Sequence, residues 1–124
     1  MSCATISLRR VLTTFLLSLT VLVSTSAAAE VAVTLVRLTS PVAPFTDATL
    51  EIKTSPGADC RIVVTYKSGP SRARGLVPLA ADRAGRVAWT WRVGSNTTPG
   101  QWPIEVTCRK GEDTGALRMS FEVR

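Results

Sequence analysis

The sequence predicts an all-β protein, a seven-stranded antiparallel β-sandwich crosslinked by one disulfide bond. Three observations lead to this prediction. Apolar and polar residues alternate with period two in most segments after residue 30, turn residues separate these segments, and two cysteines fall on the apolar phase of two of them. Alternation gives a strand one dry and one wet face, and several short strands joined by turns are typical of sandwiches.

Residues 1–29 have the features of a secretory signal peptide. Two consecutive arginines precede an apolar run at 11–23, and Ala27-Ala28-Ala29 provides an A-x-A cleavage pattern. The apolar run is shorter than the roughly 20 residues that a membrane-spanning helix needs. We therefore expect cleavage after this segment and a secreted or cell-envelope domain covering 30–124. Retention of the segment as an anchor is the alternative.

Seven segments of the mature chain carry the strand pattern. The first is almost uniformly apolar, and the fourth is short and interrupted by Pro78, which is typical of an edge strand. The expected strands cover residues 31–38, 48–53, 60–67, 76–79, 86–93, 102–109 and 117–124. Between the fourth and fifth strands, Asp82-Arg83-Ala84-Gly85 predicts a type I turn that closes on a glycine at positive φ.

Two cysteines, Cys60 and Cys108, remain after cleavage and predict one disulfide bond in an exported domain. The third and sixth strands are antiparallel neighbours in sandwiches of this kind. Cys60 begins the third and Cys108 ends the sixth, so the bond joins neighbouring strands, unlike the antibody-type bridge between strands two and six. No C-x-x-C pair or His completes a redox or zinc site, so we expect no metal and no cofactor.

The segment Asn96–Cys108, NTTPGQWPIEVTC, fits the pattern T-x-P-G-x-[YW]-x-[IV]-x-V that lies before and along the sixth strand of a known module type. Through this motif, and through 87–93 in the fifth strand, the chain from Asp47 to Val123 resembles the small immunoglobulin-like or fibronectin III-like modules of secreted bacterial proteins. The resemblance implies an adhesion, spacer or ligand-binding role without catalytic residues. A weaker resemblance, of Asn96-Thr97-Thr98-Pro99-Gly100 to the N-P-T-T-G loop of immunoglobulin-like cysteine-protease inhibitors, implies an exported inhibitor.

The composition limits the chemistry. The chain has 124 residues, 45% of them hydrophobic and 19% charged, which suits one small domain with its own core. It has no His, which excludes Ser-His-Asp and Cys-His catalysis. The acidic residues are scattered over turns and outward strand positions, whereas a glycosidase needs two facing carboxyl groups. We therefore expect no enzyme activity.

Trp102 is the candidate aromatic contact. Trp89, Trp91 and Trp102 all lie on the apolar phase of their strands, so core packing is the first interpretation of each. Trp102 differs because it directly follows a loop, and we expect it to be the most exposed of the three. An exposed ring at that place provides a platform for a sugar ring or a peptide.

A basic patch is the second candidate. The loop 67–75, KSGPSRARG, contains no acidic residue, and two further arginines are expected near it at the same end or edge of the sandwich. The patch consists of Lys67, Arg72, Arg74, Arg83 and Arg86. It would attract anionic polymers such as cell-wall polyanions, lipid headgroups or nucleic acid. The alternative is a solvated loop that keeps an edge strand soluble.

These observations predict a secreted, non-enzymatic binding, adhesion or structural module of the bacterial cell envelope or exterior. Its partner is expected to be an extracellular protein, a glycan or an anionic polymer. Two alternatives stay open: a polyanion-binding module that uses the basic loop, and an exported protein inhibitor. The sequence identifies neither the ligand nor the oligomeric state.

Overall fold

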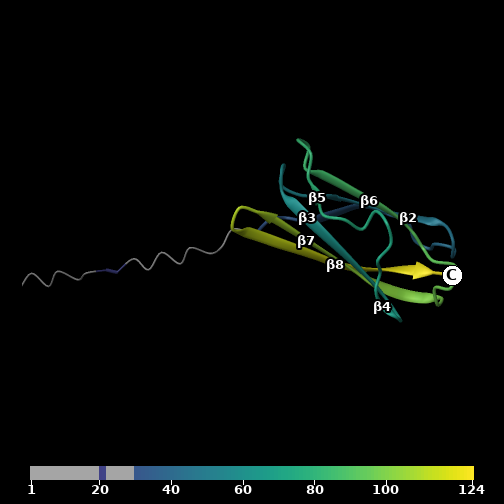
Figure 1. Ribbon diagram of the computed structural model, residues 1–124. Helices are drawn as coiled ribbons and strands as arrows, with labels where there is room; N and C mark the ends of the chain where they lie inside the picture. The colour runs from purple at the N-terminus through teal and green to yellow at the C-terminus, as the bar shows by residue number, and fades with distance from the viewer. Residues whose placement is uncertain (1–19, 22–29) are drawn as a thin grey trace, which may run out of the picture.

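The computed structural model describes residues 20–21 and 30–124, and the described residues form strands, turns and loops without a helix (Figure 1). The strands are β1 (Thr34–Leu38), β2 (Asp47–Lys53), β3 (Asp59–Tyr66), β4 (Gly69–Pro70), β5 (Leu79–Ala80), β6 (Arg86–Arg92), β7 (Gly100–Lys110) and β8 (Asp113–Val123). No helix long and apolar enough to cross a bilayer occurs in this part of the chain. The all-β prediction is confirmed.

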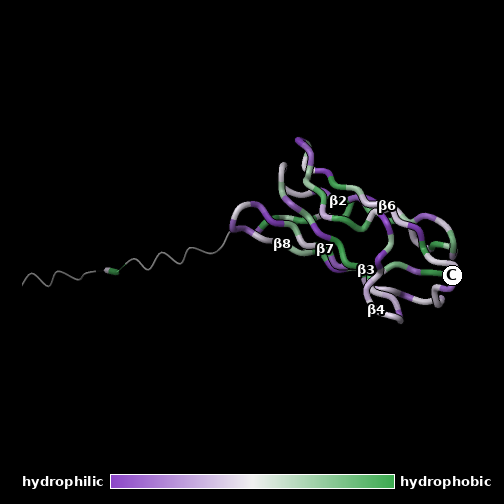
Figure 2. Tube along the Cα trace, in the orientation of Figure 1, coloured by the Kyte–Doolittle hydropathy of each residue, from purple (hydrophilic) through white to green (hydrophobic). Residues whose placement is uncertain are grey.

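The strands form two antiparallel sheets. One has the order β1-β2-β6, and the other has the order β4-β3-β7-β8, with β5 also paired to β3. Figure 1 shows β2 and β6 in one layer and β3, β7 and β8 in the other. Figure 2 shows hydrophobic and hydrophilic residues in succession along the strands, as expected of strands with one buried face.

The core lies between the sheets. Its largest side chains are Trp89 and Trp91 of β6, each 1% exposed, and Phe121 of β8, which is fully buried. Trp91 and Phe121 meet edge to face, with ring centroids 5.8 Å apart. The prediction of core packing is therefore confirmed for Trp89 and Trp91.

The structure has eight strands where the sequence predicts seven. The extra strand, β4, pairs for two residues with the end of β3, and the expected strand 76–79 is reduced to β5, which pairs with Asp59 and Cys60. Pro70 and Pro78 explain the short pairing, because proline donates no backbone hydrogen bond to a ladder. The prediction of seven strands is therefore wrong in number, although the two-layer arrangement agrees with it.

The disulfide bond joins Cys60 and Cys108 as predicted. The two residues are direct partners in the β3–β7 ladder, their Cα atoms lie 4.1 Å apart, and both are fully buried. The crosslink therefore holds two neighbouring strands of one sheet together from inside the core.

The segment 71–78 covers one open side of the sandwich. The Trp89 Nε1–H group donates a 2.8 Å hydrogen bond to the Val77 carbonyl, which ties this segment to the core. Gly75, at φ +94°, lies so close to the Thr90 carbonyl that an added Cβ would overlap it. The segment thus depends on a core indole and on a glycine to follow the edge of β6.

The turn at 82–85 has the predicted form. Gly85 has a φ of 77°, and its N–H donates a 2.9 Å hydrogen bond to the Asp82 carbonyl. The Asp82 carboxylate also accepts hydrogen bonds from the backbone N–H groups of Ala84 and Arg86. Aspartate at the first position and glycine at the last therefore define this turn.

The predicted signal peptide, 1–29, lies outside the described residues except for Thr20 and Val21, and stays a prediction. Val31, directly after the expected mature start, is already buried. Its N–H donates a 3.1 Å hydrogen bond to the Thr114 carbonyl at the start of β8. The packed part of the fold thus includes the second residue of the expected mature chain.

Candidate functional site

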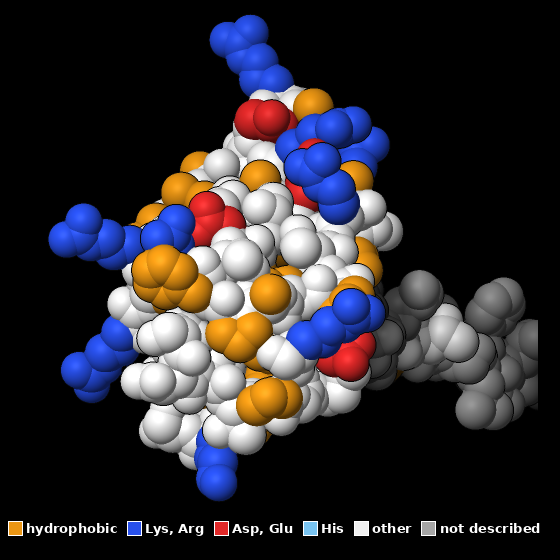
Figure 3. Space-filling model, turned by 90° about the vertical axis from the view of Figure 1, so that its right-hand side faces the viewer, with side chains coloured by type: hydrophobic (Ala, Val, Ile, Leu, Met, Phe, Trp, Pro, Cys, Tyr) orange, Lys and Arg blue, Asp and Glu red, His pale blue; other side chains and the backbone are white. Residues whose placement is uncertain are grey.

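Several connections meet at one end of the sandwich. β3 ends here at Tyr66, β6 ends here at Arg92, and Asp47, the first residue of β2, is the ladder partner of Arg92. The β1–β2 loop, the β3–β4 turn and the β6–β7 loop therefore share this end, which we call the loop end. Figure 3 looks onto it: polar surface covers most of it, apolar side chains stand in between, and basic side chains project mainly at the rim.

A groove of about 660 Å³ lies at the loop end, between the β3–β4 turn and the β6–β7 loop. Its lining combines one phenol, one ammonium group, four hydroxyl groups and one side-chain amide. The lining residues are Tyr66, Lys67, Ser68, Gly94, Ser95, Asn96, Thr97 and Thr98. We call it the end groove. It provides many hydrogen-bonding groups beside one aromatic wall, and none of its lining residues is acidic.

Core aromatic residues hold Tyr66 in place. Its hydroxyl accepts a 3.2 Å hydrogen bond from Trp91 Nε1–H, and its ring meets the Trp102 ring edge to face at 6.2 Å. Burial raises the pKa of the Tyr66 phenol, and the hydrogen bond from Trp91 opposes this rise in pKa. The groove therefore has a rigid aromatic wall that carries no charge at neutral pH.

Trp102 supports the groove from behind. It is partly buried, and its Nε1–H donates a 2.8 Å hydrogen bond to the carbonyl of Thr98, a lining residue. This bond ties the β6–β7 loop to β7. The structure therefore places the predicted aromatic contact beside the groove, in a position where it holds the loop.

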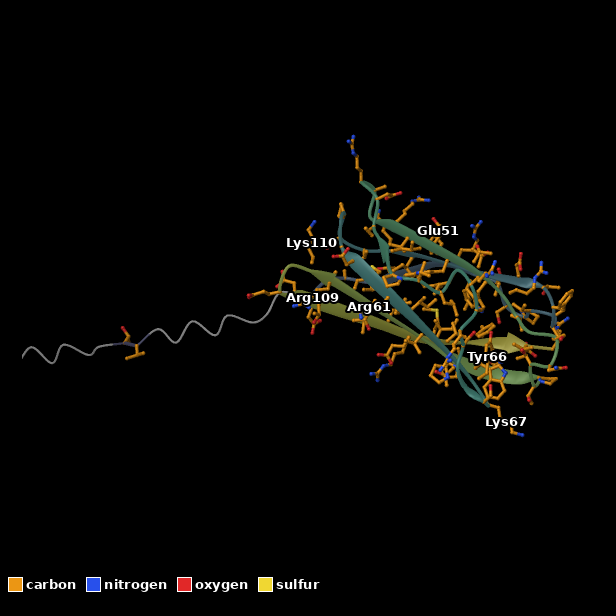
Figure 4. The ribbon with its side chains drawn as sticks, in the orientation of Figure 1. Glu51, Arg61, Tyr66, Lys67, Arg109 and Lys110 are labelled. Carbon is orange, nitrogen blue, oxygen red and sulfur yellow. A yellow bond between two sulfur atoms is a disulfide. The ribbon has the colours of Figure 1, made fainter. Side chains whose placement is uncertain are left out.

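The predicted basic residues are not gathered in one place. Lys67 lies at the loop end, whereas Arg83 and Arg86 belong to the turn and strand start beside Asp59, at the other end of β3. Lys67 lies eight positions beyond Asp59 along the chain, which in a strand corresponds to roughly 26 Å. Figure 4 shows the same separation, with Lys67 at one end and Lys110 at the other.

The remaining members of the predicted patch also differ in their surroundings. Arg72 and Arg74 lie on the segment 71–78 along the side of the sandwich, and both are exposed. Arg86 forms a 3.2 Å ion pair with Glu51, which also pairs with Arg37 at 3.5 Å. Lys67 is therefore the predicted basic residue that lines the end groove.

The most exposed aromatic residue in the described part of the chain is Phe45, which sequence reasoning did not single out. It lies in the β1–β2 loop and is 65% exposed. The Arg92 guanidinium stands 5.1 Å from the centre of its ring. The sequence does contain an indication of this exposure, because Phe45 lies between Pro44 and Thr46, outside every alternating segment.

Metal ligands do not gather among residues 20–21 and 30–124, since no three His, Cys, Asp or Glu side chains there lie close enough to hold an ion. The chemistry that the end groove provides is hydrogen bonding, aromatic contact and the single ammonium group of Lys67. The arrangement suits the binding of a polar ligand.

Comparison with known proteins gives a likeness of fold. No family model matches the chain, and no curated protein matches it. The chitinase ChiW from Paenibacillus, a bacterial cell-surface-expressed multi-modular enzyme, is similar over 76% of this chain and 8% of its own, with a TM-score of 0.50 and 18% identity. The chain has the fold of one module of such an enzyme.

A family 123 glycoside hydrolase from Clostridium perfringens is similar over 77% of this chain and 27% of its own, with a TM-score of 0.39 and 11% identity. The chain thus spans a small part of the length of either enzyme. The similarity to the chitinase module shows that this chain has the fold of a small β domain of the kind that occurs within larger bacterial proteins.

Proposed function

We propose that the chain is an exported, non-enzymatic module of immunoglobulin-like or fibronectin III-like type that binds a neutral glycan in the end groove. The observation that supports this most is the lining of the groove. Sugar hydroxyl groups need many donors and acceptors, and the apolar faces of sugar rings need an aromatic or aliphatic surface. Tyr66 supplies the surface, and Asn96, Thr97 and their neighbours supply the polar groups.

The support behind the groove favours binding with little rearrangement. Trp91 fixes the Tyr66 hydroxyl, and Trp102 fixes the Thr98 carbonyl. A site that is already ordered loses less conformational entropy when a ligand binds. This compensates in part for the openness of the groove to water.

Chitin oligosaccharides are the first ligands to test. They are neutral, and their hydroxyl and acetamido groups match the hydroxyl and amide groups of the groove. The similar module of known structure belongs to a chitinase. An accessory, substrate-holding role beside a separate catalytic domain is the biological setting that this proposal implies.

The polyanion alternative receives less support from the arrangement of charges. Lys67 is the cation among the lining residues, and Arg83 and Arg86 lie at the other end of the sandwich. Acidic residues also lie at that end, because Asp59 is the ladder partner of Arg109 and Asp113 is the ladder partner of Lys110. The inhibitor alternative rests on the displaced N-P-T-T-G order alone.

Calorimetric titration of the oxidised, exported protein with chitohexaose tests the proposal. We expect measurable binding that changes little with salt, because no charge is neutralised. Asn96→Ala removes one groove amide and is expected to weaken binding about 2–10-fold. Thr114→Ala, an exposed polar deletion at the other end of the sandwich, is the control and should bind like the wild type.

Two results would contradict the proposal. One is equal affinity of the Asn96→Ala variant and the wild type for chitohexaose. The other is binding to dextran sulfate alone, with an affinity that falls steeply as salt rises, since this is the signature of a polyanion site.

A further inference from the structure

Phe45 is presented to solvent by a loop that has little freedom of its own. The loop contains Pro41 and Pro44, whose φ angles are fixed by their rings. The Phe45 N–H donates a 2.8 Å hydrogen bond to the Val93 carbonyl, and the Thr46 carbonyl accepts a 2.9 Å bond from the Val93 N–H. The ring is therefore exposed and at the same time held in position.

The backbone of Phe45 is in the left-handed region, with a φ of 64°, and it is the one non-glycine residue with positive φ in the described part of the chain. This conformation is unfavourable for a bulky side chain, whereas glycine and asparagine adopt it with little or no cost. Because the ring is 65% exposed, core packing does not compensate for this cost. Strain of this kind concentrates at sites that contact ligands.

Arg92 leaves part of the ring available. Its guanidinium stands 5.1 Å from the ring centre, and its Nε–H donates a 3.2 Å hydrogen bond to the Asp47 carboxylate. The cation that stands over the Phe45 ring is therefore paired with a carboxylate. A neutral ligand can approach such a ring without the cost of an unpaired charge.

The loop that carries Phe45 is joined directly to the end groove. Val93, the residue that exchanges both hydrogen bonds with this loop, is the chain neighbour of Gly94, which lines the groove. Both features therefore belong to the loop end, the surface shown in Figure 3. A chain of several sugar rings that occupies the groove can extend over this surface toward Phe45.

We propose that Phe45 is a second contact for the glycan, a platform on which a sugar ring stacks when the ligand is long enough to reach beyond the end groove. The proposal rests on the proposed function, because it concerns the same ligand. It makes the module selective for a polysaccharide chain over a short sugar.

Titration of wild type and variants with chitobiose and chitohexaose tests this proposal. The wild type should bind chitohexaose more tightly than chitobiose. Phe45→Asn should bind chitohexaose about tenfold more weakly and chitobiose unchanged, because one stacked ring is lost and the groove is intact. Phe45→Tyr keeps the ring and should restore the preference for the longer ligand.

Stability is measured on the same samples by urea unfolding. The urea midpoint of Phe45→Asn should be equal to or higher than that of the wild type, because asparagine tolerates the left-handed conformation. Val63→Thr, which removes an exposed apolar side chain on the outer face of β3, is the control and should bind both ligands like the wild type.

The outcomes separate the two proposals. If Phe45→Asn binds chitohexaose as tightly as the wild type does, the stacking platform is overturned while the groove stands. If the wild type binds neither oligosaccharide, the proposed function fails, and the platform fails with it. An equal loss of affinity for chitobiose and chitohexaose in Phe45→Asn would also contradict the stacking platform, because Phe45 would then act within the end groove itself.

Discussion

Removal of the disulfide bond by the double substitution Cys60→Ala and Cys108→Ala should strongly destabilise the fold. The crosslink spans a sequence separation of 48 residues. For a loop of this length the chain-entropy relation gives about 14 cal/mol/K, or about 4 kcal/mol at room temperature. The total stability of a domain of this size is about 5–14 kcal/mol, so the bond accounts for a large share of it.

Equilibrium unfolding in urea measures this loss. With a denaturant dependence of about 1–2 kcal/mol per molar urea, the midpoint should fall by about 2–4 M. Reduced wild-type protein is the control, since it keeps both buried sulfur atoms and loses only the bond; it should show a similar fall. Equal midpoints for oxidised wild type, reduced wild type and the double variant would show that the bond contributes little to stability, and free thiols in the exported protein would show that it does not form.

Two further changes probe the core around the end groove and the segment 71–78. Trp89→Phe should lower the free energy of unfolding by about 2–3 kcal/mol, because it leaves a cavity and deprives the Val77 carbonyl of its donor, and it should speed amide hydrogen exchange in 71–78. Unchanged exchange there would contradict the role of the indole. The second change concerns Tyr66, the single tyrosine of the chain, whose pKa is raised by burial. Its ionisation, followed by ultraviolet absorbance, should require a pH above the ordinary value near 10. The phenol is harder to ionise when folded, so its contribution to stability is complete below that pH and is lost as pH rises past it. Tyr66→Phe should therefore lose less stability at alkaline pH than the wild type; an equal loss would contradict the assignment.

The two-layer fold could be predicted because its strands have one buried face. Alternation in 86–93 and 102–109 identifies β6 to within one residue and β7 to within two. The cysteines could also be placed, since a residue that starts one strand and a residue that ends its antiparallel neighbour must meet. Periodicity is a local property of the sequence, whereas the pairing of these two strands follows from the topology expected of a sandwich.

Strand length was harder to predict. β8 begins at Asp113, whereas the pattern places its start at 117. The hairpin pairs Lys110 with Asp113 and continues through Gly115, so backbone hydrogen bonding extends the ladder beyond the alternating part. A residue without a side chain gives no periodic signal, although it can still pair.

The predicted basic patch does not assemble because of the directions in which the strands run. Lys67 follows the third strand and Arg83 precedes the fifth, and one antiparallel strand between them carries the chain to the opposite end. The loops therefore lie at different ends, whatever their charges. Counting the strands between two loops would have separated these residues from sequence alone.

The aromatic residues show what periodicity can and cannot identify. Trp102 lies on the inward phase, and its partial burial follows from that phase and from its place near the start of β7. Phe45 belongs to no alternating pattern, because it lies in a turn. Its exposure depends on the hydrogen bonds of its loop with Val93, a contact between residues far apart in the sequence.

Binding of a neutral glycan at the loop end can be tested residue by residue. The most direct test is the mapping of backbone amide chemical shifts by nuclear magnetic resonance during titration with chitohexaose. Shifts should concentrate at residues 66–68 and 94–98 and include Phe45, while the opposite end around 82–85 and 111–112 should stay unchanged. Shifts confined to that opposite end or to the outer face of β3 and β7, or no shifts at all, would contradict binding at the loop end.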